Sequence, residues 1–80
     1  MKLTAKQLDK LREAFRLSPR EAEMVALICD GATENKELAA RMGVTVATAK
    51  TMLHGIFGKT RRSDKSQLLL LCFDLFHPDI

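Results

Sequence analysis

Apolar side chains recur along this chain of 80 residues at intervals of three and four positions, which is the spacing of one face of an α-helix. The alternation of apolar and polar residues that marks a half-buried β-strand does not occur. Start and stop signals divide the pattern into helices expected at residues 5–16, 19–30, 34–42, 46–59 and 65–77. The sequence therefore predicts an all-α fold of short helices and tight turns.

Each expected helix follows a residue whose side chain can accept hydrogen bonds from the free N–H groups of the first helical turn. Three of these starts also have a Glu or Gln three residues later, the capping-box pattern: Thr4 with Gln7, Ser18 with Glu21, and Asp64 with Gln67. The caps of the third and fourth helices are expected to be Thr33 and Thr45. Gly31 and Gly43 stand where the second and third helices end, in places that suit a left-handed backbone.

The last expected helix has almost no polar face. Eight of the nine residues from 68 to 76 are apolar, so a helix there is hydrophobic all round. A chain of this length has too few other elements to cover such a helix, because small domains bury a limited share of their surface. We therefore expect a homodimer formed through helix 65–77, with the interface residues Leu68, Leu69, Leu71, Cys72, Leu75 and Phe76.

The composition is that of one small globular domain, with 46% hydrophobic and 29% charged residues. No apolar run approaches the roughly 20 residues of a membrane span, and the amino end lacks the apolar segment of a signal peptide. We expect a cytoplasmic protein without membrane contact. Cys29 and Cys72 lie in apolar segments without a second Cys or a His at metal-ligand spacing, so reduced, buried thiols and no bound metal are expected.

Basic residues are concentrated in the middle of the chain. The net charge is +3, yet residues 33–63 alone carry six basic and two acidic side chains, and residues 44–63 carry no acidic one. The helix expected at 46–59 places apolar side chains inward at Ala49, Met52, Leu53, Ile56 and Phe57. Its opposite face presents Ala47, Lys50, Thr51, His54 and Gly58. A basic outer face of this kind fits either a solvated helix side or a contact with nucleic acid.

Residues 34–59 combine a short helix, a turn at Gly43 and a second, basic helix, which is the pattern of a helix-turn-helix. Ala39 is small at the place where the two helices would cross. Leu38, Ala49 and Met52 are apolar where the pair needs a shared interior. The sequence thus predicts a helix-turn-helix with its basic helix turned outward.

A series of short motifs extends this pattern from residue 17 to residue 60. They are Leu17-Ser18-Pro19-Arg20-Glu21, Gly31 with Thr33, Asn35-Lys36-Glu37-Leu38-Ala39, Met42-Gly43-Val44-Thr45, Thr48-Ala49-Lys50 and Ile56-Phe57-Gly58-Lys59. In this order they resemble the four-helix DNA-binding domain of the LuxR family of bacterial transcription regulators, also called the GerE or FixJ/NarL family. The chain departs from the family pattern at Ala49, where Val is usual, and at Gly55 and Gly58 within the second helix.

The resemblance implies a tetrahelical DNA-binding and dimerisation domain over residues 17–80, preceded by an amphipathic helix extension over residues 1–16. It implies that helix 46–59 enters the major groove of double-stranded DNA and that the last helix forms a homodimer. The implied DNA-binding residues are Lys50, Thr51, His54, Ala47, Thr48, Thr45, Lys59, Asn35, Lys36, Arg61 and Arg62. Of these, Thr45, Thr48 and Lys59 are expected near phosphates.

Two other interpretations remain open at this stage. The chain could be a protein-interaction module that sequesters or blocks another transcription regulator through its apolar last helix. It could also be a module like region four of a sigma factor, which shares the layout of four helices and binds RNA polymerase. No nucleophile and base stand at a catalytic spacing and there is no glycine-rich phosphate loop, so neither enzymatic activity nor a cofactor is expected.

Overall fold

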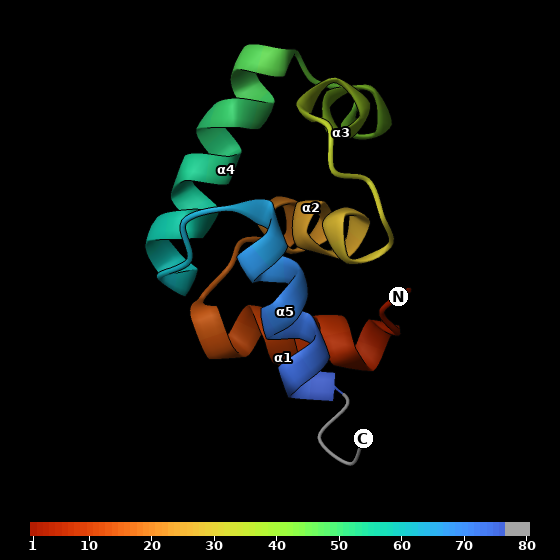
Figure 1. Ribbon diagram of the computed structural model, residues 1–80, viewed down its shortest axis with the longest axis vertical. Helices are drawn as coiled ribbons and strands as arrows, with labels where there is room; N and C mark the ends of the chain where they lie inside the picture. Colours follow the sequence, from red (N-terminus) through yellow and green to blue (C-terminus); the bar gives the residue numbers. More distant parts are fainter. Residues whose placement is uncertain (77–80) are drawn as a thin grey trace.

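The computed structural model describes residues 1–76, and within that range every regular element is an α-helix (Figure 1). The helices are α1 (Ala5–Phe15), α2 (Pro19–Cys29), α3 (Asn35–Met42), α4 (Val46–Thr60) and α5 (Lys65–Phe76). The predicted all-α fold is confirmed, and each described helix end lies within one residue of the predicted position. His77, the predicted end of the last helix, lies outside the described residues. No helix in the described part of the chain is both long and apolar enough to cross a membrane.

Helix α2 forms the centre of the fold and contacts each of the other four helices. In Figure 1, α3 and the first turns of α4 stand at one end of the molecule, and α1 and α5 stand at the other, with α2 between them. Five side chains of α2 are at most 1% exposed: Ala22, Met24, Val25, Ile28 and Cys29. Leu11 of α1, Leu38 of α3, Ile56 of α4 and Leu68 of α5 join the same core. The end of the molecule that carries α3 and α4 is therefore fixed by packing on α2.

The helix starts follow the predicted caps with two exceptions. Both capping boxes at the starts of α1 and α2 are present, and Thr45 caps α4. The cap of α3 is Glu34, without a side-chain hydrogen bond, so the prediction of Thr33 is wrong. At the start of α5 the Gln67 N–H donates to Asp64 Oδ1 over 2.9 Å, but the Gln67 side chain accepts from the Ser63 N–H and does not complete the box.

Two helix ends could not be predicted from glycine. Gly43 has φ 67° and closes α3, as expected. In contrast, the left-handed cap that follows α1 is Arg16, with φ 55°, and the one that follows α4 is Arg61, with φ 57°. Both arginines adopt the left-handed backbone without the freedom of glycine, so the surrounding turns impose this conformation.

Helix α5 has a buried face and an exposed face, although its sequence is apolar on both. Leu68 and Cys72 are fully buried and Leu71 is 7% exposed, all within the core of the same chain. The exposed residues are Leu70, Phe73 and Leu75, with exposed fractions of 62%, 42% and 43%. The predicted dimer interface therefore needs correction at Leu68, Leu71 and Cys72, because these side chains have almost no surface left for a second copy. Of the other predicted residues, Leu75 is exposed and Leu69 and Phe76 are half-buried.

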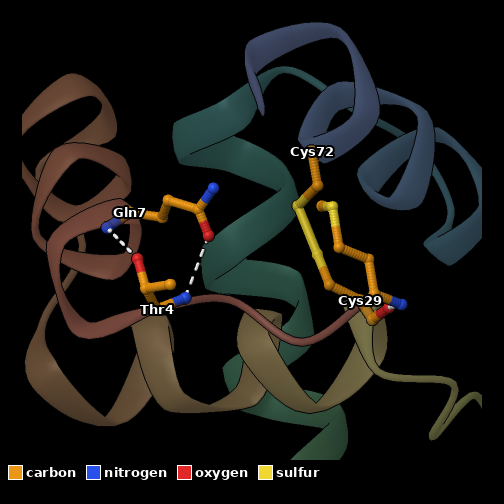
Figure 2. Close-up of a disulfide and its surroundings, with 5 residues drawn as sticks. Thr4, Gln7, Cys29 and Cys72 are labelled. Carbon is orange, nitrogen blue, oxygen red and sulfur yellow. Dashed lines mark hydrogen bonds between the residues drawn. A yellow bond between two sulfur atoms is a disulfide. The ribbon is translucent and has the colours of Figure 1, made fainter. Parts of the chain in front are cut away.

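Cys29 and Cys72 are joined by a disulfide, so the prediction of two reduced thiols is wrong. Figure 2 shows the bond between the last residue of α2 and the middle of α5. The two cysteines are 43 positions apart in the sequence and at most 1% exposed. The N-terminal amino group docks beside them and donates to the Cys29 carbonyl over 2.7 Å. The disulfide thus fastens α5 to the end of α2.

Candidate nucleic-acid interface

A turn of three residues, 43–45, joins α3 to α4 and gives the helix-turn-helix its shape. Gly43 closes α3, and the Val44 N–H donates to the Ala39 carbonyl over 3.0 Å. Thr45 then starts α4, because its hydroxyl oxygen accepts from the Thr48 N–H over 3.1 Å. The backbone groups at both ends of the turn are satisfied locally, so this short segment has a defined conformation.

The two helices share an apolar interior. Its members are at most 5% exposed: Leu38, Ala39, Met42, Ala49 and Leu53. Ile56, one turn further along α4, is fully buried, whereas Met52 and Phe57 are half-buried. The predicted inward face of α4 is therefore confirmed at Ala49, Leu53 and Ile56, with the other two side chains at its margin.

The solvent side of α4 carries a continuous row of exposed side chains, which we call the outer stripe: Val46, Ala47, Lys50, Thr51 and His54. Their spacing of one, three and four positions places them on one side of the helix. The predicted exposure is confirmed for Ala47, Lys50, Thr51 and His54. The stripe lies within residues 44–63, which hold no acidic side chain, so its charge is positive or neutral throughout.

Val46 is a member of the outer stripe that sequence reasoning missed. Its side chain is 40% exposed, an uncommon position for a large hydrophobic residue in this structure. An available signal was its place four residues before Lys50, which puts it on the same helical face one turn earlier. Its orientation was not predicted, because Val46 is the first residue of α4 and no preceding helical turn shows which side of the helix it occupies.

Hydroxyl groups on the outer stripe and at the start of α4 form hydrogen bonds within the chain. The Thr51 hydroxyl donates to the Ala47 carbonyl over 3.1 Å. The Thr45 hydroxyl donates to the Thr48 hydroxyl oxygen over 3.0 Å. Both hydroxyl hydrogens are thus donated within the chain, and Thr45 and Thr51 present oxygen lone pairs and methyl groups to solvent.

Two charged residues of α2 hold the helix-turn-helix in place, and neither was among the predicted site residues. Arg20 donates through Nη2 to the Met42 carbonyl over 2.6 Å, which secures the end of α3. Its other nitrogen, Nη1, pairs with Glu23 over 2.9 Å. One residue along, the Glu21 carboxylate pairs with Lys59 near the end of α4 over 2.6 Å. These contacts connect α2 to both helices of the motif.

Glu21 also completes the capping box of α2 by accepting from the Ser18 N–H over 2.9 Å. Partial burial of the carboxylate by itself raises the pKa of Glu21. The hydrogen bond from Lys59, the backbone hydrogen bond from Ser18 and the charge of Lys59 outweigh that effect, so the pKa of Glu21 lies below its ordinary value of 4.5. Lys59 also donates to the Arg16 carbonyl over 3.1 Å. The structure therefore gives Lys59, a predicted phosphate contact, two partners within the chain.

A groove of about 500 Å³ runs beside the outer stripe, between α4, the start of α3 and the start of α5. Its lining residues are Asn35, Lys50, Leu53, His54, Phe57, Ser63, Asp64, Lys65 and Ser66. The groove brings Asn35, Lys50 and His54 together as predicted site residues, and it adds Lys65 and the two serines, which were not predicted. Lys65 donates to the Thr33 carbonyl and so bridges the start of α5 to the loop before α3.

The remaining predicted contacts lie on separate parts of the surface. Lys36 is exposed at the start of α3. Arg61 and Arg62 follow the far end of α4, beside Leu70 and Asp74 of α5. The structure thus groups the two arginines with the exposed face of α5 and separates them from the outer stripe.

Among curated proteins, the chain is similar to the transcriptional regulatory protein LiaR of Bacillus subtilis (strain 168), with 34% identity over 73 residues. The match covers 82% of this chain and 34% of LiaR, so the chain spans about a third of the length of this relative. No family model matches the chain, and no solved structure matches it significantly. Together with the geometry of α3 and α4, the similarity to LiaR relates the chain to helix-turn-helix transcription regulators.

Proposed function

We propose that this protein is a DNA-binding transcription regulator of the LuxR type, which reads the major groove of double-stranded DNA with α4. The observation that carries the proposal is the outer stripe, an exposed row of side chains on the second helix of a helix-turn-helix. The major groove admits an α-helix, and positive charge on the helix favours the approach to phosphates. The similarity to LiaR supports a role in transcription regulation.

The outer stripe offers a distinct role to each polar side chain. Lys50 can donate to the O6 and N7 acceptors of guanine or to an adjacent phosphate. Thr51 can contact a base edge or a methyl group beside it, and His54 can contact a base or a phosphate. We expect Thr45, Thr48, Asn35 and Lys36 to contact phosphates and so to fix the register on the DNA.

A homodimer is the second part of the proposal, with α5 as its interface. Leu70, Phe73 and Leu75 are the exposed apolar side chains of α5 that a second copy would cover. Leu70 and Phe73 share one side of the helix, and Leu75 lies near its end. Two copies would present two α4 helices to half-sites about one helical turn of DNA apart. We place the protein in the cytoplasm, with DNA as its ligand and without a catalytic role, cofactor or metal.

The dimer is tested by adding charge to the exposed face of α5. We expect Leu70→Glu with Leu75→Glu to convert a dimer into a monomer in sedimentation velocity, because two buried carboxylates in the interface are costly. Ala14→Glu on the exposed side of α1 is the control and leaves the mass unchanged. A monomer before any substitution would contradict the dimer while leaving DNA binding open.

DNA reading is tested by selecting fragmented genomic DNA on the purified protein at about 0.15 M salt. We expect enrichment of a pseudo-palindromic sequence, because a symmetric dimer reads two inverted half-sites. Lys50→Ala should weaken binding by about 1 to 3 kcal/mol and relax the preference at one position of each half-site. Lys10→Ala is the matched control, since it removes one exposed lysine from α1, away from the stripe.

Two outcomes would count against this function. Equal affinity and equal preference in Lys50→Ala and the parent protein would remove Lys50 from the interface. Absence of any enriched sequence, from protein that is folded by circular dichroism, would contradict DNA reading altogether. The exposed apolar face of α5 would then favour the other candidate function, a module that pairs with another transcription regulator and blocks it.

A further inference from the structure

We propose that the first turn of α4 recognises thymine methyl groups, with Val46 as the contact residue and Ala47 beside it. The proposal rests on the proposed function, because it assigns a base preference to the DNA that α4 would read. It adds a residue to the interface and states which chemical group in the major groove that residue meets.

The exposure of Val46 is the first observation. Within residues 1–76 the exposed large hydrophobic side chains are Val46 and three on α5, namely Leu70, Phe73 and Leu75. The three on α5 share one helix, whereas Val46 stands alone at the opposite end of the molecule, where α4 begins (Figure 1). A valine side chain that is 40% exposed contributes little to the core and gains from burial against a partner.

The hydrogen-bonding capacity of this turn is the second observation. Val46 and Ala47 have no polar side-chain atom, and the hydroxyl hydrogens of Thr45 and Thr51 are donated within the chain. The remaining hydroxyl of this turn belongs to Thr48, which we expect at a phosphate. Guanine presents two acceptors in the major groove and therefore needs donors, which α4 supplies one turn later at Lys50. The apolar feature of the major groove is the C5-methyl group of thymine. The first turn of α4 is therefore matched to that group.

The position along the helix supports the same assignment. In a helix-turn-helix the residues at the start of the recognition helix contact base edges. Val46 is the first residue of α4, and Lys50 follows one turn later, about 5.4 Å along the axis. The preferred half-site should therefore contain thymine next to the base pair that Lys50 reads, with its methyl group against Val46.

Deoxyuridine tests this directly, because it differs from thymine by loss of the methyl group and keeps the same hydrogen-bonding edge. The duplex enriched in the genomic selection is synthesised with single thymine-to-deoxyuridine replacements, and its dissociation constant is measured by fluorescence anisotropy at about 0.15 M salt. We expect a three- to fourfold loss of affinity at one or two thymines of each half-site, about the effect of one buried CH₂ group. Replacements outside the half-sites should have no effect.

Two variants assign the effect to Val46. Val46→Ala should bind the thymine duplex more weakly and lose the difference between thymine and deoxyuridine at the same position. Lys50→Ala should bind both duplexes more weakly but keep their ratio. Because Val46 is exposed, circular dichroism should show an unchanged helical content for Val46→Ala.

Equal affinity for thymine and deoxyuridine at every position would overturn the inference and leave the proposed function standing. A difference that persists unchanged in Val46→Ala would also overturn it, because the methyl group would then meet another residue. If no duplex is enriched in the selection, the proposed function fails and this inference fails with it.

Discussion

Glu21 shows how much a single side chain can hold together in a small domain. Its carboxylate accepts from the Ser18 N–H at the start of α2 and pairs with Lys59 at the end of α4. Lys59 in turn donates to the Arg16 carbonyl. One carboxylate therefore connects the α1–α2 turn to the helix that carries the outer stripe.

Replacing this carboxylate with an amide tests its contribution. Glu21→Gln should lower the free energy of unfolding at pH 7 by about 1 kcal/mol, because a charge-assisted contact with a half-exposed lysine is lost. Urea unfolding measures the difference. Glu23→Gln is the control, since Glu23 pairs with Arg20 on the exposed surface and should cost less.

The pH dependence of the same pair has a defined sign. Because the folded pKa of Glu21 is lowered, its contribution is present above the unfolded value of about 4.5 and is lost as the pH falls through the folded pKa. The stability difference between the parent protein and Glu21→Gln should therefore be constant at neutral pH and shrink in acid. A difference that grows in acid would contradict this account.

Some of the individual site residues could be predicted from the sequence. Lys50, Thr51 and His54 follow from the helical period, because each is flanked by apolar positions that fix the inward face. Lys65 was not predictable as a neighbour of His54, because the groove forms only when α5 returns to the start of α3. The partners of Lys59 were hidden for the same reason, since Glu21 lies 38 positions earlier in the chain.

Helix α4 is continuous although its sequence contains two glycines, which disfavour a helix. It runs without a break from Val46 to Thr60 although it contains Gly55 and Gly58. A glycine inside a helix costs about 1 kcal/mol relative to alanine. At Gly55 an added Cβ would lie 3.1 Å from Oε2 of Glu21, whereas at Gly58 it would meet open space. The first glycine therefore makes room for the Glu21–Lys59 pair, and the structure gives no such reason for the second.

This difference predicts opposite consequences for two similar substitutions. Gly58→Ala should raise the free energy of unfolding by about 0.5 to 1 kcal/mol, because helix propensity improves without a clash. Gly55→Ala should gain clearly less, or lose stability, because the Glu21 carboxylate must move. Thermal and urea unfolding of the two variants provide the comparison. Equal stabilisation by both would show that the approach of Glu21 imposes no constraint.

Helix positions were predictable to within one residue because caps and glycines act locally. The orientation of α5 was not predictable, because a helix that is apolar all round carries no period to show its inward face. Contact with α2 buries Leu68, Leu71 and Cys72 and leaves Leu70 and Leu75 outside. Tertiary packing thus decides what the helical pattern alone leaves undetermined.

For the molecule as a whole, the disulfide is the feature that sequence reasoning missed. A separation of 43 positions says nothing about distance in space, and two apolar surroundings favour buried thiols equally well. The bond becomes apparent only when α5 packs across the end of α2 (Figure 2). Both cysteines belong to the core, so the bond and the packing of α5 depend on each other.

Reduction of this bond should weaken the whole fold. We expect the free energy of unfolding to fall by about 2 to 4 kcal/mol in the presence of dithiothreitol, because the unfolded chain regains the freedom of a long loop. Urea unfolding with and without the reductant measures the loss. The double variant Cys29→Ala, Cys72→Ala is the control, and its free energy of unfolding should be the same with and without the reductant. Equal stability of the parent protein in both conditions would contradict this expectation.

The disulfide also determines how the molecule would respond to mechanical tension. The bond from Cys29 to Cys72 closes a covalent ring around residues 30–71, which contain all of α3 and α4. A force applied at residues 1 and 76 crosses from one cysteine to the other and bypasses the ring. The end-to-end length of the fully extended chain should therefore be shorter by roughly 140 Å in the oxidised than in the reduced protein, because the enclosed segment cannot extend. The ring shields the helix-turn-helix from tension that would unravel α1 and the rest of α2.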